Sequence, residues 1–171
     1  VSLEHPHGQI YCLPFIPPRI ERELNSVLEF KKEHGKCLFC EIMEREIKAK
    51  VRIICENESF VAFVPYFTHF PYEIHIYSRK HIQSIADFDK KMVTDFSKLL
   101  KEVVLRYDAL KVGTMPYIMA QHNAPSNSDH RDEWHFHVEF YTIYRGPDRI
   151  KYQGGVEQGC HTFVNDVFPE D

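Results

Sequence analysis

The chain has 171 residues and a mass of 20.3 kDa, and 43% apolar and 27% charged residues are typical of one globular domain. A net charge of −4 and a pI near 6.3 argue against a general nucleic-acid binder. No apolar run approaches the roughly 20 residues that span a bilayer. The first residues lack the basic and apolar regions of a secretory signal, so we expect the reducing cytoplasm as the compartment.

Hydrophobic periodicity predicts two helices and several short strands. Residues 8–16 are expected to be extended up to Pro17 and Pro18, which suit the first turn of a helix that stops at Gly35. A longer helix is predicted over 87–110. β-Branched and aromatic residues predict strands at 51–55, 59–64, 72–77, 117–121 and 135–142. Short connections favour an α+β fold, in which a long helix packs on an antiparallel sheet.

Eleven histidines are the unusual feature of the composition, and two segments arrange some of them in rows. The segments His5-Pro6-His7-Gly8-Gln9 and His135-Phe136-His137-Val138-Glu139 carry polar side chains at every second position. Alternate side chains of a strand share one face, so each segment presents a row of ligands or nucleophiles. A polar strand face on a histidine-rich surface is the alternative.

Cys37 and Cys40 form the closely spaced pair among five cysteines and are expected in a short knuckle. A Cys-x-x-Cys pair supplies half of a tetrahedral zinc shell, and His81 and His135 are candidates for the rest. Two reduced cysteines without a metal, or a redox pair, are the alternatives. The strand–helix–strand setting of a thioredoxin-like redox motif is missing.

For two further residues, Glu23 and His122, the sequence is compatible with either a structural or a functional role. Glu23 lies on the charged side of the first helix and reads as a solvated carboxylate. His122 ends a predicted strand, where functional residues are common, although a turn histidine is equally consistent. Five histidines have no recognisable setting and are expected to be structural: His34, His69, His75, His130 and His161.

The segment HPHGQIY resembles the active-site motif of galactose-1-phosphate uridylyltransferases, which belong to the histidine-triad superfamily. The resemblance continues in order through FVAFVPYFTHFPYEIHIYSRKHI, RYDAL, MAQHNAP, EWHFHVEFY and KYQGGVEQGCHTFVNDVFPED. It covers essentially the whole chain, but only the later half of such enzymes. It implies that residues 1–16 are the last active-site strand of an N-terminal repeat and that residues 17–171 form a histidine-triad-like domain.

The resemblance also implies a two-step transfer of a uridylyl group. His7 looks like the nucleophile that attacks the α-phosphorus of a UDP-sugar, and Gln9 like the donor to a non-bridging phosphoryl oxygen. Ser2 falls at a phosphate-contacting position, and Lys151 and Glu157 at sugar- or phosphate-contacting positions. The implied substrates are UDP-glucose or UDP-galactose and hexose 1-phosphates, and the implied assembly is a homodimer.

Two metal sites are implied as well. The zinc-binding quartet of histidine-triad proteins is matched by Cys37, Cys40, His81 and His135. A second site, for iron or zinc, matches Glu23, His122, His137 and Glu139. Position 139 is histidine in some relatives, and a carboxylate there favours harder metals. His5 matches a further zinc ligand whose partners belong to the first half of such enzymes.

Two other functions stay open beside uridylyl transfer in galactose metabolism. One is a related phosphorylase or adenylyltransferase that acts on another nucleoside diphosphate compound. The other is a catalytically incomplete, metal-stabilised half of such an enzyme. A zinc-ribbon nucleic-acid binder is disfavoured by the acidic pI and by the absence of a Lys/Arg cluster.

Overall fold

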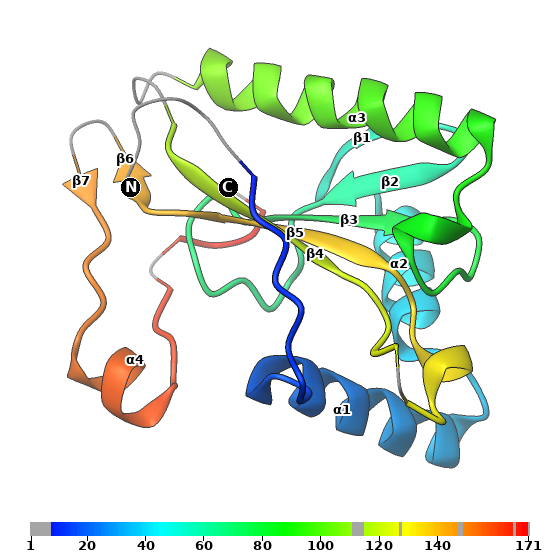
Figure 1. Ribbon diagram of the computed structural model, residues 1–171. Helices are drawn as coiled ribbons and strands as arrows, with labels where there is room; N and C mark the ends of the chain where they lie inside the picture. The colour runs from blue at the N-terminus through cyan, green and yellow to red at the C-terminus, as the bar shows by residue number, and fades with distance from the viewer. Residues whose placement is uncertain (1–7, 111–114, 127, 147–148, 166, 171) are drawn as a thin grey trace.

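A five-stranded antiparallel sheet forms the centre of the computed structural model, which describes residues 8–110, 115–126, 128–146, 149–165 and 167–170 (Figure 1). The strands lie in the order β1-β2-β3-β5-β4. Their bounds are Ile53–Glu56 (β1), Phe60–Phe63 (β2), Ile74–Ser78 (β3), Tyr117–His122 (β4) and His137–Thr142 (β5). All five correspond to predicted strands, and the predicted α+β fold with its antiparallel sheet is confirmed.

Helix α3 (Lys90–Ala109) is the long helix of the prediction, and it covers one face of the sheet (Figure 1). Its first residue is set by Asp89, whose side chain accepts a hydrogen bond from the Met92 backbone N–H at 2.8 Å. A 3₁₀ turn, η1 (Ile85–Asp87), precedes it, so the helix begins a few residues after the predicted start. No helix in the described part of the chain is long and apolar enough to cross a membrane.

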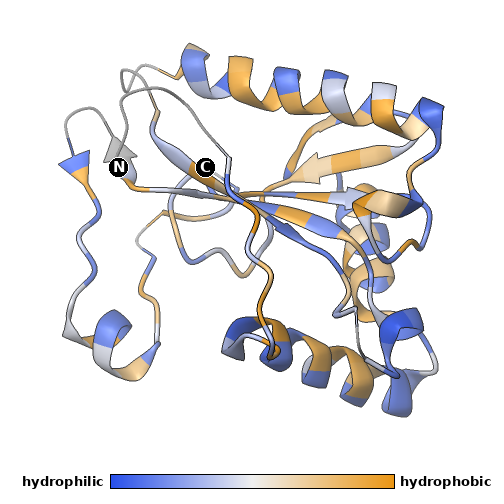
Figure 2. Ribbon diagram, viewed as in Figure 1, coloured by the Kyte–Doolittle hydropathy of each residue, from blue (hydrophilic) through white to orange (hydrophobic). Residues whose placement is uncertain are grey.

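The main core lies between α3 and the sheet. Figure 2 shows apolar and polar residues alternating around α3, as expected for a helix with one buried face. The buried stripe of the helix consists of Met92, Phe96, Leu99, Val103 and Tyr107. It packs on a sheet face that includes Phe60, Ala62, Ile76, Phe136, Val138 and Phe140.

Helices α1 (Pro18–His34) and α2 (Leu38–Ala49) cover the opposite face. The predicted stop at Gly35 is confirmed: its φ is +68°, a left-handed conformation that favours glycine, and its N–H reaches the carbonyl of Lys31. Helix α2 was not predicted, because Cys37 and the residues after it were expected to form only a short knuckle. The second core joins Val27, Phe39, Met43, Val61, Phe63 and Tyr77.

The last part of the chain forms an arm on one side of the sheet (Figure 1). Its elements are β6 (Tyr144–Gly146), β7 (Arg149–Ile150) and α4 (Gly155–Cys160). After α4 the arm reaches the loop between β2 and β3, where the Asn165 side-chain amide donates to Thr68 Oγ1 at 2.8 Å.

Residues 8–16 are exposed and irregular, and they pair with no strand among the described residues. The structure therefore shows neither a helix nor a paired strand over these residues. A strand is stable only when a neighbouring strand satisfies its backbone hydrogen bonds, whatever the propensity of its side chains. The division of the chain after residue 16 stays a prediction.

Candidate functional site

Strand β5 and the residues before it supply side chains to two clusters. The even-numbered residues from 136 to 140 pack beneath α3, so the odd-numbered polar residues from 135 to 139 face α1 and α2. The prediction that His135, His137 and Glu139 share one face is confirmed. The three residues belong to two clusters: His135 lies with the two cysteines, whereas His137 and Glu139 lie with Glu23 and His122. All four ligand atoms of each cluster lie within 4.8 Å of one another.

The first cluster joins α2 to the loops beside the sheet. Cys37 is the N-cap residue of α2 and Cys40 lies in its first turn, so the helix places both thiols at one end. Cys40 Sγ lies 3.5 Å from His81 Nδ1 and 3.3 Å from His135 Nδ1, and Cys37 Sγ lies 3.9 Å from His135 Nδ1. A tetrahedral zinc ion with ordinary bond lengths separates its sulfur and nitrogen ligands by roughly 3.3–3.8 Å. The spacing of these side chains therefore fits a metal ion.

Main-chain carbonyls orient both imidazoles of this cluster. His135 Nε2–H donates to the Ser78 carbonyl at 2.8 Å, and His81 Nε2–H donates to the Asp132 carbonyl at 2.9 Å. Since a carbonyl only accepts, each Nε2 carries the proton and each Nδ1 presents a lone pair to the thiols. A hydrogen bond from the Cys40 thiol, followed by contacts with the imidazoles, lowers the pKa of Cys37 and favours its thiolate. The imidazoles and the Cys37 thiolate are thus in the states that a metal needs. The hydrogen bond to Cys37 and burial raise the pKa of Cys40, so metal binding would release the proton of that thiol.

The second cluster lies where α1 crosses the ends of β4 and β5. His122 Nδ1 lies 3.0 Å from His137 Nε2 and 3.0 Å from Glu23 Oε2. His137 Nε2 lies 3.6 Å from Glu23 Oε2 and 3.7 Å from Glu139 Oε1. His137 Nδ1–H donates to the carbonyl of His135 at 2.9 Å, which leaves the Nε2 lone pair for the cluster. Two nitrogens and two carboxylate oxygens at this spacing also fit a divalent metal ion.

Both carboxylates of the second cluster are ionised in their buried setting. Burial alone raises a carboxyl pKa, but His75, His122, His137 and Arg19 together lower the pKa of Glu139 to about 2. The pKa of Glu23 likewise lies far below its usual value despite burial, because its carboxylate accepts a hydrogen bond from His122 at 3.0 Å and lies 3.6 Å from His137 Nε2.

Three residues that contact this cluster were missed from the sequence. Arg19 Nη2 donates to Glu139 Oε2 at 2.6 Å, and the Tyr141 hydroxyl donates to the same oxygen. His75 Nε2 lies 2.9 Å from Glu73 Oε1 and 3.6 Å from Glu139 Oε1. His75 was expected to be structural. A signal was present, because Arg19 precedes Glu23 by one helical turn and Tyr141 continues the alternation of the β5 row.

A cavity of about 630 Å³ opens beside the second cluster. Its volume is within the range of roughly 300–1,000 Å³ that is common for small-molecule sites. The cavity lies between α1, α2 and the loop after β2, and its polar wall carries Arg19, Arg22, Glu23 and Glu139. Its aromatic wall carries Tyr66, Phe67, His69, Tyr77 and Phe163.

The predicted reaction residues are only partly within the described structure. Ser2, His5 and His7 lie outside the described residues. Gln9 is exposed, and its side-chain oxygen accepts a hydrogen bond from the Tyr11 hydroxyl. The structure therefore brings together the residues of both predicted metal clusters. Among the described residues, it shows no hydrogen bond between Gln9 and the other predicted substrate contacts, Lys151 and Glu157.

The two predicted contact residues of the C-terminal arm bind the main chain. Lys151 Nζ donates to the carbonyl of His69 at 3.0 Å and to the carbonyl of Val164. Glu157 Oε2 accepts from the Gly154 N–H at 2.8 Å. Neither residue lines the 630 Å³ cavity.

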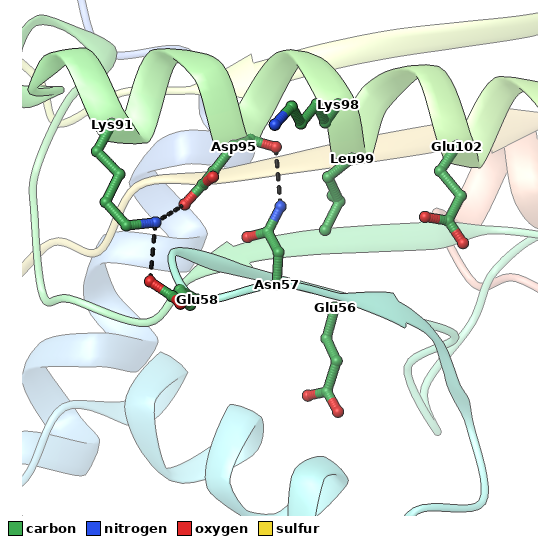
Figure 3. Close-up of a pocket in the computed structure, with 8 residues that line it drawn as sticks. All are labelled: Glu56, Asn57, Glu58, Lys91, Asp95, Lys98, Leu99 and Glu102. Atoms are coloured by element: carbon green, nitrogen blue, oxygen red, sulfur yellow. Dashed lines mark hydrogen bonds and ion pairs between the residues drawn. The ribbon is translucent and has the colours of Figure 1, made fainter.

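A second hollow, of about 420 Å³, lies between α3 and the turn from β1 to β2 (Figure 3). Lys91 lies 3.0 Å from Glu58 and 2.5 Å from Asp95, and the Asn57 amide donates to the Asp95 carbonyl at 2.9 Å. These contacts hold the turn against α3, and the ammonium of Lys91 is paired with the carboxylates of Glu58 and Asp95. They are typical of a solvated helix surface rather than of a binding site.

Comparison with known sequences identifies the family. Residues 23–147 match the family described as galactose-1-phosphate uridyl transferase, C-terminal domain. The galactose-1-phosphate uridylyltransferase of Thermotoga maritima is 41% identical over 171 residues, which is 99% of this chain and 53% of that protein. The chain thus spans about half the length of the curated relatives it matches.

Solved structures agree with the sequence comparison. A structure described as a uridylyltransferase mutant superposes with a TM-score of 0.92 at 36% identity, over 99% of this chain and 55% of that one. An ADP-glucose phosphorylase from Arabidopsis thaliana, solved with bound ADP-glucose, superposes with a TM-score of 0.78 at 27% identity, over 92% of this chain and 48% of that one. Since the family match spans most of the chain, this protein belongs to the family of galactose-1-phosphate uridyl transferase C-terminal domains.

Proposed function

We propose that this chain takes part in the transfer of a uridylyl group between UDP-glucose and galactose 1-phosphate, a step of galactose metabolism. The observation that carries the proposal is the match of residues 23–147 to the C-terminal domain of that transferase family. The identity of 41% to the Thermotoga maritima enzyme supports it. The activity is proposed for the whole protein, because such relatives are about twice as long as this chain.

His7 is the proposed nucleophile. Its imidazole attacks the α-phosphorus of UDP-glucose, the bond from that phosphorus to the bridging oxygen breaks, and glucose 1-phosphate leaves. A phosphate oxygen of galactose 1-phosphate then attacks the uridylyl-histidine, which forms UDP-galactose and restores His7. Gln9 would donate a hydrogen bond to a non-bridging oxygen, where charge develops in both steps. The HPHGQ motif supports these roles.

Ser2, Lys151 and Glu157 are the proposed contacts to the phosphates and the sugar. Lys151 and Glu157 lie in the arm that begins after β5, so movement of this arm would reposition both residues together. We also propose a homodimer in the cytoplasm, where reduced cysteines are available to hold a metal.

We propose zinc for the cluster of Cys37, Cys40, His81 and His135, because two thiols and two imidazole nitrogens form the donor set that zinc prefers. For Glu23, His122, His137 and Glu139 we propose zinc or iron, since the set contains nitrogen and oxygen donors only. Four protein ligands fill each shell, so the chemistry that the metals would supply is cross-linking of α1 and α2 to the sheet. His5 would serve a further zinc site with partners elsewhere.

A nucleoside-diphosphate-sugar phosphorylase is the second candidate. The superposition on the ADP-glucose phosphorylase favours it, because that structure matches 92% of this chain. In a phosphorylase, inorganic phosphate would take the place of the hexose 1-phosphate as acceptor, and the same histidine would carry the nucleotidyl group.

Labelling with radioactive UDP-glucose and ADP-glucose tests both candidates. We expect UDP-glucose to leave an acid-labile, base-stable label on the protein, and we expect His7→Gln to abolish it. Galactose 1-phosphate should then discharge the label. A label from ADP-glucose that only inorganic phosphate discharges would favour the phosphorylase. If no label forms even in a longer chain that carries an N-terminal half, the transferase proposal is wrong; if it forms only there, this chain is the incomplete half.

A further inference from the structure

One guanidinium contacts both carboxylates of the Glu23 cluster. Arg19 Nε donates to Glu23 Oε1 at 3.1 Å, and Arg19 Nη2 donates to Glu139 Oε2 at 2.6 Å. Glu23 comes from α1 and Glu139 from β5, elements that are far apart in the sequence. The planar fork of arginine holds its donors in a fixed geometry, so it sets the orientation of both carboxylates at once.

The oxygens that Arg19 leaves are those that face the histidines. Glu23 Oε2 lies 3.0 Å from His122 Nδ1, and Glu139 Oε1 lies 3.7 Å from His137 Nε2. In each carboxylate, one oxygen therefore contacts the guanidinium and the other faces the histidines of the cluster. We propose that Arg19 is a positioning residue that restricts Glu23 and Glu139 to one ligand oxygen each, and thereby sets the metal preference of the cluster.

Further contacts fix Arg19 and the outer oxygen of Glu139. The Tyr141 hydroxyl donates to Glu139 Oε2, so this oxygen accepts two hydrogen bonds outside the cluster. The Arg19 guanidinium carbon lies 5.0 Å from the centre of the Tyr141 ring, within cation–π range. The side chain of Glu139 is only 5% exposed, so water offers its outer oxygen little alternative to these donors, whereas the Arg19 side chain is 43% exposed.

The restriction has a chemical consequence. Carboxylates bind metals through one or two oxygens, and two-oxygen binding raises the coordination number. Four donor atoms suit zinc, whereas manganese favours six ligands that are mostly oxygen. Without Arg19, both carboxylates are free to turn their second oxygens inward. The preference for zinc over manganese should then fall.

This inference rests on the proposal that the cluster holds a metal, and cobalt(II) tests the two separately. One equivalent of zinc is added first to fill the thiolate cluster, because soft thiolate ligands select zinc and the Glu23 cluster offers only nitrogen and oxygen donors. Cobalt is then titrated into the wild-type protein and into Arg19→Met, Arg19→Lys and Arg22→Met. Absence of thiolate charge-transfer bands confirms that cobalt has not replaced zinc at the cysteines. Zinc and manganese competition gives the metal preference.

The wild-type protein should give the intense visible bands of four-coordinate cobalt. We expect both Arg19 variants to give weaker bands and to lose about tenfold or more of the preference for zinc over manganese, the scale at which outer contacts tune metal sites. Arg22→Met is the matched control, because Arg22 lines the same cavity one turn along α1 and has no carboxylate partner in the described part of the chain.

Each other outcome counts against the inference in a distinct way. A spectrum and a metal preference of Arg19→Met that equal those of the wild type overturn it. Wild-type behaviour of Arg19→Lys alone shows that charge, not the two-carboxylate bridge, is responsible. An equal effect of Arg22→Met shows a general effect of cavity charge. If the wild-type protein binds no cobalt after the zinc addition, the metal proposal for this cluster fails first.

Discussion

Replacement of Cys40 by serine should remove the metal from the thiol cluster and lower the thermal stability of the whole chain. The Cys40 sulfur approaches both imidazoles of the cluster, at 3.5 Å and 3.3 Å. The cluster cross-links residues 41 to 98 positions apart in sequence, so a bound ion holds α2 and the two sheet-edge loops together. A serine hydroxyl is a poor zinc ligand, and three remaining donors leave the shell incomplete.

The size of the effect follows from mass action. A ligand that binds only the folded state and is present at about 1,000 times its Kd stabilises by about 4.1 kcal/mol. For a chain of this length, each kcal/mol moves Tm by roughly 2–4 °C, so loss of the zinc should lower Tm by roughly 8–16 °C. A chelator should lower the Tm of the wild-type protein by a similar amount and leave Cys40→Ser almost unchanged.

The assay combines metal analysis by mass spectrometry with thermal unfolding followed by circular dichroism. Cys160→Ser is the control, because Cys160 is exposed and lies outside both clusters. It should retain the wild-type zinc content and Tm. Equal zinc content in Cys40→Ser and the wild type, or a wild-type Tm that a chelator does not change, would refute the assignment of these four residues as a zinc site.

Two further predictions concern parts of the chain away from the clusters. Arg52→Met should cost about 3–5 kcal/mol in urea unfolding, because it leaves the buried carboxylate of Glu46 without the arginine that donates to both of its oxygens. Arg45→Met, which breaks an exposed ion pair, should cost less than about 1 kcal/mol, and equal losses would contradict the reasoning. The backbone N–H of Gly154 holds the pKa of Glu157 below its ordinary value of 4.5. The ionised carboxylate therefore stabilises the arm at pH values above 4.5. This stabilisation is lost as the pH falls through the lower pKa of the folded state. Amide protection factors over 154–164 should fall with acid in the wild type but not in Glu157→Gln, and the same acid response in both would disprove this anchor.

The regular elements were predictable because their information is local. Pro17 and Gly35 bracket α1 through backbone preferences that act within a few residues. The buried stripe of α3 repeats at helical spacing over about four turns, and the side chain of Asp89 caps the first turn of the helix. Helix α2 was missed because the Cys-x-x-Cys spacing is compatible with a loop as well as with a helix. Its amphipathic residues become decisive only when Phe39 and Met43 meet the sheet.

The two clusters were identified through the family resemblance together with the Cys-x-x-Cys pair and the alternating row. Position 139 shows the limit of that approach. Its carboxylate could be named as a ligand, but the oxygen that it offers depends on Arg19 and Tyr141, which no motif singled out. His75 was missed for the same reason, since its contacts with Glu73 and Glu139 arise from strand pairing.

The sequence by itself determined the ends of α1, the strand alternation and the kinds of donor atoms that the chain offers, because propensity, capping and side-chain chemistry act over a few neighbouring residues. Only the tertiary structure decided that His135 turns to the cysteines while His137 turns to Glu23, and that Arg19 divides the oxygens of two carboxylates. Those choices depend on distances between segments up to 120 residues apart, which are set when the faces of the sheet are covered by helices and buried polar groups must find partners.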